Sequence, residues 1–69
     1  MAVRERIKEL IDRAHRLVAS GDLDAARDAI VEAQRLADEH RVGQDLVDSV
    51  RDGIGEYLAM ARLIGGGST

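Results

Sequence analysis

Hydrophobic positions recur with a helical period in three successive segments of the chain, residues 3–20, 23–41 and 45–64. In each segment the apolar residues are spaced by three or four positions, which places them on one face of an α-helix. These positions are Val3, Ile7, Leu10, Ala14 and Leu17, then Leu23, Ala26, Ile30, Ala33 and Ala37, then Val47, Val50, Ile54, Tyr57, Ala61 and Ile64. The pattern therefore predicts an all-α fold with three amphipathic helices.

Two short segments rich in turn-forming residues separate the predicted helices. Gly21 can take the left-handed conformation that ends a helix, and the Asp22 carboxylate can accept hydrogen bonds from the free amides that open the next one. Gly43 and Asp45 repeat this chemistry, so we expect Gly43 to end the second helix and Asp45 to cap the third. The expected architecture is an antiparallel, up-down-up three-helix bundle.

Small residues indicate where the helices approach one another. Alanine dominates the second helix, and its short side chain lets neighbouring helices pack closely, so we expect this helix to be contacted on two sides. Ala26 and Ala33 are expected to face the first helix. Gly53 and Gly55 lie inside the third helix at a cost of about 1 kcal/mol each relative to alanine. We expect them to permit a close backbone approach or a kink.

Composition limits the classes of function. The 69 residues suffice for one domain, which we assign to residues 1–64, with residues 65–69 as a flexible Gly/Ser tail or linker. Cysteine, tryptophan and phenylalanine are absent, which excludes disulfides, thiolate metal sites and base-stacking platforms. The net charge is −3 and no face gathers enough Lys and Arg to bind several phosphates, so we expect no nucleic-acid partner. No apolar run reaches the ~18 residues of a membrane span, so we expect no membrane partner and a cytoplasmic protein.

Candidate chemistry in the sequence is sparse. His15 and His40 are expected to lie about 18 Å apart along the bundle, too far to share a metal ion, and we interpret both as surface residues. We expect neither a cofactor nor a catalytic residue. A small helical enzyme with an arginine-lined anion site is an alternative, but Arg13, Arg27 and Arg51 lie beside the apolar stripe rather than on it, so their charged ends can reach water.

The first two helices resemble a tetratricopeptide repeat. Leu10, Ala14 and Leu17 match the bulky, small and bulky positions of that family's first helix, and the chain turns through Gly21-Asp22-Leu23. The small, bulky and small positions of its second helix are matched by Ala26, Ile30 and Ala33. The resemblance covers about residues 7–40 and implies a helical hairpin used for protein binding.

The hairpin with its third helix also resembles the MIT (microtubule-interacting and trafficking) domain, a three-helix relative of that repeat. The segment from Ala14 to Arg27, AHRLVASGDLDAAR, follows that family's pattern without gaps, and Glu56-Tyr57-Leu58 followed by Ala61 is similar to its third helix. Designed helical-repeat scaffolds use the same Gly-Asp turns and alanine ridges. An engineered or de novo scaffold without natural activity therefore remains an alternative.

The end of the third helix is the candidate interaction site. The segment 57–64 is apolar nearly all round, broken only by Arg62, which is typical of a helix that is covered on more than one side. We expect one stripe to be buried within the chain, formed by Ile54, Tyr57, Ala61 and Ile64. The predicted interaction residues are Leu58, Met60 and Leu63, with Tyr57 at the edge. They predict a non-catalytic module that binds either a second copy of itself, as a homo-oligomer, or an amphipathic peptide helix.

Overall fold

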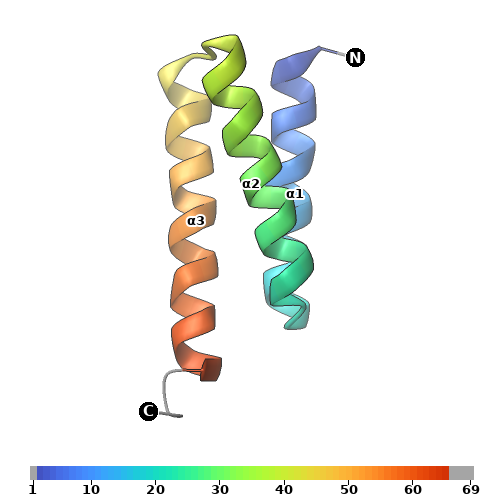
Figure 1. The fold of residues 1–69 in the computed structure, drawn as a ribbon, viewed down its shortest axis with the longest axis vertical. Coiled ribbons are helices and arrows are strands. Elements are labelled where there is room, and N and C mark those ends of the chain that lie inside the picture. Colours follow the sequence, from blue (N-terminus) through green and yellow to red (C-terminus); the bar gives the residue numbers. More distant parts are fainter. Residues whose placement is uncertain (1, 66–69) are drawn as a thin grey trace.

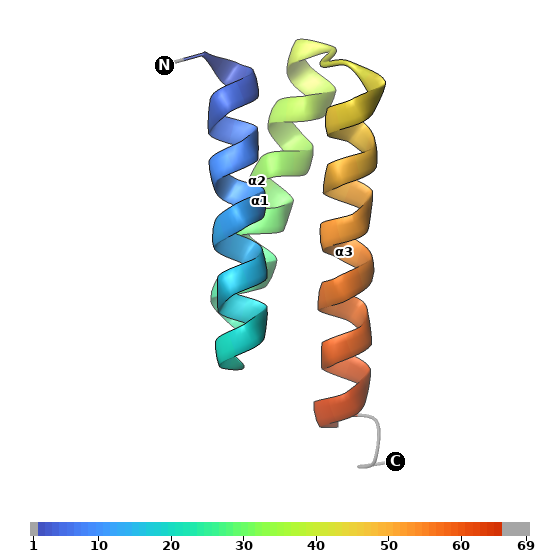
Figure 2. The same cartoon turned by 180° about the vertical axis from the view of Figure 1, so that it is seen from behind.

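A computed structural model describes residues 2–65 and shows the predicted all-α three-helix bundle. Helix α1 spans Val3–Ser20, α2 spans Leu23–His40 and α3 spans Gln44–Gly65. The helices run down, up and down in the views of Figures 1 and 2, so α1 and α3 are parallel and α2 is antiparallel to both. Each helix contacts both others, and the α1–α2 interface is the most extensive.

The expected boundary between domain and tail shifts by one residue. Gly65, which we assigned to the tail, is the last residue of α3. The remaining tail positions, 66–69, lie outside the described residues.

The first turn has the geometry that the sequence predicts. Gly21 is left-handed, with φ 87°, and its amide donates to the Val18 carbonyl at 3.1 Å. The amide of Asp22 donates to the Leu17 carbonyl at 2.9 Å, which completes a Schellman motif. The Asp22 carboxylate then accepts a hydrogen bond from the Ala25 amide at 3.3 Å. One Gly-Asp step thus ends α1 and opens α2.

The second turn differs from the expectation. Helix α2 ends at His40. The residue directly after it, Arg41, takes the left-handed conformation that ends a helix, with φ 48°. Gly43 instead opens α3, since its carbonyl accepts from the Val47 amide at 3.2 Å. A Cβ on Gly43 would lie 2.7 Å from Asp45 Oδ1, so glycine leaves room for that carboxylate. Asp45 lies inside the first turn of α3 rather than before it.

The core lies along the axis of the bundle and is built mainly from isoleucine, leucine and alanine. Ala26 and Ala33 are fully buried, as expected for short side chains at a close helix–helix contact. The main cluster consists of Ile7, Leu10, Ile11 and Ala14 from α1, Ala29, Ile30, Ala33 and Ala37 from α2, and Leu46 and Val50 from α3. No charged or polar side chain is buried among the residues that the structure describes.

The two glycines inside α3 do not mark a close backbone contact. Gly53 is buried and Gly55 is exposed, yet a Cβ added to either would meet no atom within 4 Å. Helix α3 is also continuous through both positions. The expected close approach is therefore wrong within this chain, and Gly53 lies beside unfilled space.

Candidate functional site

Two polar contacts show how α1 and α3 lie side by side. Near the top of the bundle, an Arg4 guanidinium nitrogen donates to Asp45 Oδ2 at 2.9 Å. Three turns lower, His15 Nδ1 lies 2.7 Å from Glu56 Oε2. Both pairs are separated by 41 residues, so a residue of α1 is level with the residue 41 positions later in α3.

This register carries the end of α3 past the end of α1. Ser20, the last residue of α1, is level with Ala61, so residues 62–65 extend about 6 Å beyond α1. Figures 1 and 2 both show α3 reaching past the end of α1. In the lower half of α3, which we define as residues 53–65, no residue after Gly53 is buried. The predicted interaction residues all lie in this lower half.

The predicted interaction residues are exposed to different degrees. Leu58 is 54% exposed and Leu63 is 79% exposed, as the sequence predicts for side chains that point away from the core. Met60 and Tyr57 are half-buried, and Tyr57 packs against the core cluster. Ile64 was expected to be buried but is 61% exposed, because it lies past the end of α1.

His15, which we interpreted as a surface residue, lies at the α1–α3 interface and keeps part of its side chain exposed. Its side chain is 39% exposed and faces Glu56 across the α1–α3 interface. The ring nitrogen and the carboxylate oxygen lie within hydrogen-bonding distance. The contact joins residues far apart in the sequence, and no local pattern around His15 signals it.

A shallow groove of about 170 Å³ runs between α2 and α3. Its apolar lining consists of Ala37 from α2 and Val47, Val50 and Ile54 from α3. Gln34 and Asp38 border it on α2, and Arg51 borders it on α3. This groove is a second surface, beside α3, on which an apolar partner could lie.

The predicted interaction residues do not form one patch. Leu58 follows Ile54 by one helical turn and therefore lies on the α2 side of α3, next to the groove. Met60 and Leu63 follow Glu56 by one and two turns and lie on the α1 side. At about 100° per residue, Leu58 and Leu63 are about 140° apart around the helix. The lower half of α3 thus has two apolar flanks.

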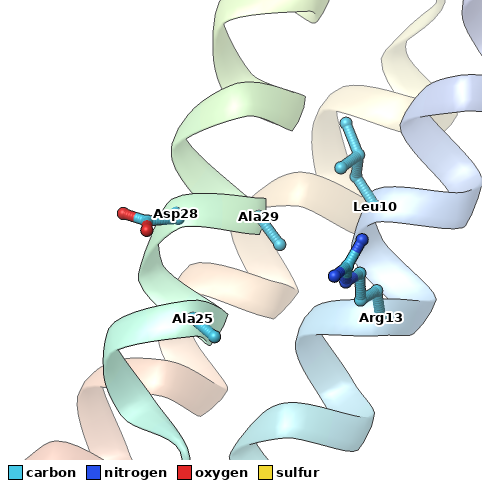
Figure 3. A pocket seen from close by; sticks show the side chains of 5 residues that line it. All are labelled: Leu10, Arg13, Ala25, Asp28 and Ala29. Atoms are coloured by element: carbon cyan, nitrogen blue, oxygen red, sulfur yellow. The ribbon is translucent and has the colours of Figure 1, made fainter.

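A second hollow, of about 260 Å³, lies over the seam between α1 and α2. Its lining consists of Leu10 and Arg13 from α1 and Ala25, Asp28 and Ala29 from α2. In Figure 3 the Arg13 side chain lies over the seam beside the two alanines, whereas the Asp28 carboxylate points away from it. Arg13, Arg27 and Arg51 are all exposed, so their charged ends reach water as the sequence predicts.

Two charged groups have shifted pKa values, and both lie away from the lower half of α3. The pKa of Asp45 is lowered, first by the hydrogen bond from Arg4 and then by the bond from the Leu46 amide. The pKa of Arg35 is raised by its hydrogen bond to Glu32, with the charges of Glu32 and Glu39 adding to the effect. Both shifts arise from ion pairs on the surface and do not mark a reactive site.

The described residues hold no group of three or more His, Asp or Glu side chains placed to bind a metal ion. His15 and His40 lie on different helices, and His40 is exposed at the end of α2. None of the helices within residues 2–65 is long and apolar enough to cross a membrane.

Comparisons of the chain with protein-family models, with curated proteins and with solved structures found no match. The resemblances to the tetratricopeptide repeat and to the MIT domain therefore stay hypotheses.

Proposed function

We propose that this protein is a non-catalytic module that associates with another protein surface through the lower half of α3. The observation that carries the proposal is the concentration of exposed apolar side chains there. Four large hydrophobic residues are exposed among those described, and Leu58, Leu63 and Ile64 lie on this half-helix. Only Val31, on α2, lies elsewhere.

Exposed apolar side chains are costly for so small a protein. Apolar surface left in water costs about 25 cal/mol per Å², so the exposed apolar side chains on the two flanks of the lower half of α3 favour a partner that covers them. Methionine adapts its shape to different partners, which suits Met60 to a contact surface. Tyr57 can keep its hydroxyl in water while its ring packs against the core and a partner.

Two kinds of partner fit this surface. A second copy of the chain would give a homo-oligomer, as expected for a natural self-association module and equally for a designed scaffold. An amphipathic helix would place apolar anchors at positions i, i+3, i+4 and i+7 along the groove between α2 and α3. The second version is the one implied by the resemblance to repeat and MIT domains.

The test replaces apolar side chains on each flank that do not contribute to the buried core. Met60→Glu combined with Leu63→Lys leaves the net charge unchanged and should abolish an association on the α1 flank of α3, whereas Leu58→Glu should abolish one on the α2 flank, with helicity by circular dichroism kept in both. The matched control is Asp12→Lys with Arg16→Glu, which also conserves net charge but lies on an exposed part of α1. Association measured by light scattering should be unchanged in this control.

A parent protein that stays monomeric at high concentration and binds no helical peptide would contradict the proposal. So would a parent whose association is unaffected by substitutions on either flank of the lower half of α3.

A further inference from the structure

The side of α3 that faces away from the bundle is open. Figures 1 and 2 both show α1 and α2 on the same side of α3. Four exposed residues form a stripe on the opposite side, because they are spaced by three, four and three positions. They are Asp52, Gly55, Ala59 and Arg62, and we call them the outer stripe. At about 100° per residue, Gly55 is about 160° from the buried Gly53, and the outer stripe lies within the arc between Leu58 and Leu63.

The two charged ends of the outer stripe have no partner within the chain. Within the part of the chain that the structure describes, neither Asp52 nor Arg62 forms a side-chain hydrogen bond or an ion pair. Neither has a residue of opposite charge one helical turn away on α3. The α1–α3 face behaves differently, because Arg4–Asp45 and His15–Glu56 pair across it. An ion pair of Asp52 or Arg62 therefore has to come from a second molecule.

The outer stripe is symmetric about the level of Tyr57. Gly55 precedes this level by two positions and Ala59 follows it by two. Asp52 precedes it by five positions and Arg62 follows it by five. A two-fold axis perpendicular to α3 at this level therefore sets each acid opposite a base and each glycine opposite an alanine. The stripe is thus complementary to itself when two α3 helices are antiparallel, whereas a parallel pair would set acid against acid.

We propose that two copies of this chain associate through the open sides of their α3 helices, packed antiparallel. Asp52 of one copy then pairs with Arg62 of the other, and this contact occurs twice. Gly55 faces Ala59 of the second copy, and side chains this small let the helix axes approach to about 8 Å. Leu58, which is 54% exposed, lies one position from the axis and meets Leu58 of the second copy at the edge. The inference rests on the proposed function and names its partner and the side of α3.

The size of this contact sets its expected strength. Residues 52–63 span about 18 Å of helix, and one helix pair of this length buries less than the ~1200 Å² at the lower end of stable interfaces. Arg51 borders the outer stripe and comes beside Arg62 of the second copy, which weakens the contact further. The dimer is therefore expected to be weak and to depend on concentration. Arg51→Glu should tighten it, by roughly threefold.

The experiment exchanges charges and measures self-association by sedimentation equilibrium up to about 1 mM chain, a range suited to weak complexes. Asp52→Arg sets bases against each other, Arg62→Asp sets acids against each other, and each variant alone should weaken the dimer by roughly tenfold. Mixing the two variants should restore association as a heterodimer. The matched control carries both changes in one chain, which keeps the net charge and should dimerise like the parent. Circular dichroism of each variant checks that the helices are kept.

A second substitution separates close packing from general hydrophobic association. Ala59→Leu adds exposed apolar surface, which would strengthen an unspecific association. In the antiparallel pair the larger side chain pushes the two helices apart, so this variant should weaken the dimer by roughly tenfold. Ala19→Leu adds the same surface at an exposed position of α1 and should leave the dimer unchanged. A dimer that is tightened by Ala59→Leu would overturn the inference.

The outcomes separate this inference from the proposed function. A dimer that is indifferent to both charge variants but lost in Leu58→Glu, or in Met60→Glu with Leu63→Lys, would overturn the inference and leave the proposed function standing. A mixture of the two charge variants that stays monomeric, beside a dimeric parent, would also overturn the inference. So would a monomeric parent that binds an amphipathic helical peptide, which would keep the proposed function. A monomer that binds nothing would contradict both.

Discussion

His15 of α1 and Glu56 of α3 are joined by a contact of 2.7 Å between Nδ1 and Oε2. The two residues are 41 positions apart, the same separation as between Arg4 and Asp45. The contact therefore belongs to a register that aligns the whole of α1 with α3 and carries the end of α3 past the end of α1. The position of the candidate interaction surface follows from this alignment.

The contribution of the His15–Glu56 contact to stability should be small. Both side chains are more than a third exposed, and exposed pairs typically contribute about 0.2–1 kcal/mol. A double-mutant cycle with His15→Ala and Glu56→Ala, read from denaturant unfolding, should give a coupling energy in this range. A coupling of zero would show that core packing alone fixes the register.

Gly53→Ala should stabilise the protein. Alanine has a helix propensity about 1 kcal/mol better than glycine, and a Cβ at this position meets nothing within 4 Å. Adding Gly55→Ala should bring the total gain to about 2 kcal/mol, measured as the free energy of unfolding. If the double variant is more stable but associates less well, the glycines serve a contact with a partner, since they serve none within the chain.

Arg41→Gly should also stabilise the protein, because a left-handed residue with a side chain costs about 1–2 kcal/mol relative to glycine. Gly43→Ala is the matched change in the same turn and should have the opposite effect, since its Cβ would push on Asp45 Oδ1 at 2.7 Å. Thermal unfolding of the two variants measures both signs. Equal effects from the two substitutions would mean that the turn adopts another conformation.

The Arg4–Asp45 pair predicts a dependence on pH. The pKa of Asp45 is lowered in the folded state by the bond from Arg4, so this carboxylate stabilises the fold above its unfolded pKa. That contribution is lost as the pH falls through the folded pKa. The difference in thermal midpoint between the parent and Asp45→Asn should therefore shrink between about pH 7 and about pH 3. Asp12→Asn, which alters an exposed carboxylate without a bonded partner among the described residues, is the control and should show no such trend.

Local chemistry made much of the fold predictable. The spacing of Ile7, Leu10 and Ala14 defines a helical face whatever that face packs against, and the structure buries all three. Gly21 and Asp22 interact with residues at most five positions away, so their roles could also be read from sequence. The conformation of the second turn could not be predicted in this way. The segment between α2 and α3 contains both Arg41 and Gly43, and residue propensity alone favours the glycine as the left-handed residue.

The candidate site was predictable only in part. Leu58 and Leu63 could be identified as surplus apolar residues on a helix with two short neighbours. The exposure of Ile64 could not be predicted from the sequence, because it depends on the register between α1 and α3. The division into two flanks has the same origin, since it requires knowing that Glu56 faces α1 and that Ile54 borders the α2–α3 groove.

The most direct test of the central claim is sedimentation equilibrium of the parent beside Met60→Glu with Leu63→Lys and beside Leu58→Glu. We expect the parent to self-associate or to bind an amphipathic helix, and at least one of these variants to lose the association. The circular dichroism spectra of all three proteins should stay helical. Loss in Leu58→Glu would place the contact on the α2 flank of α3, and loss in the double variant would place it on the α1 flank. A parent that stays monomeric up to about 1 mM and binds no helix, or an association that survives both variants, would contradict it.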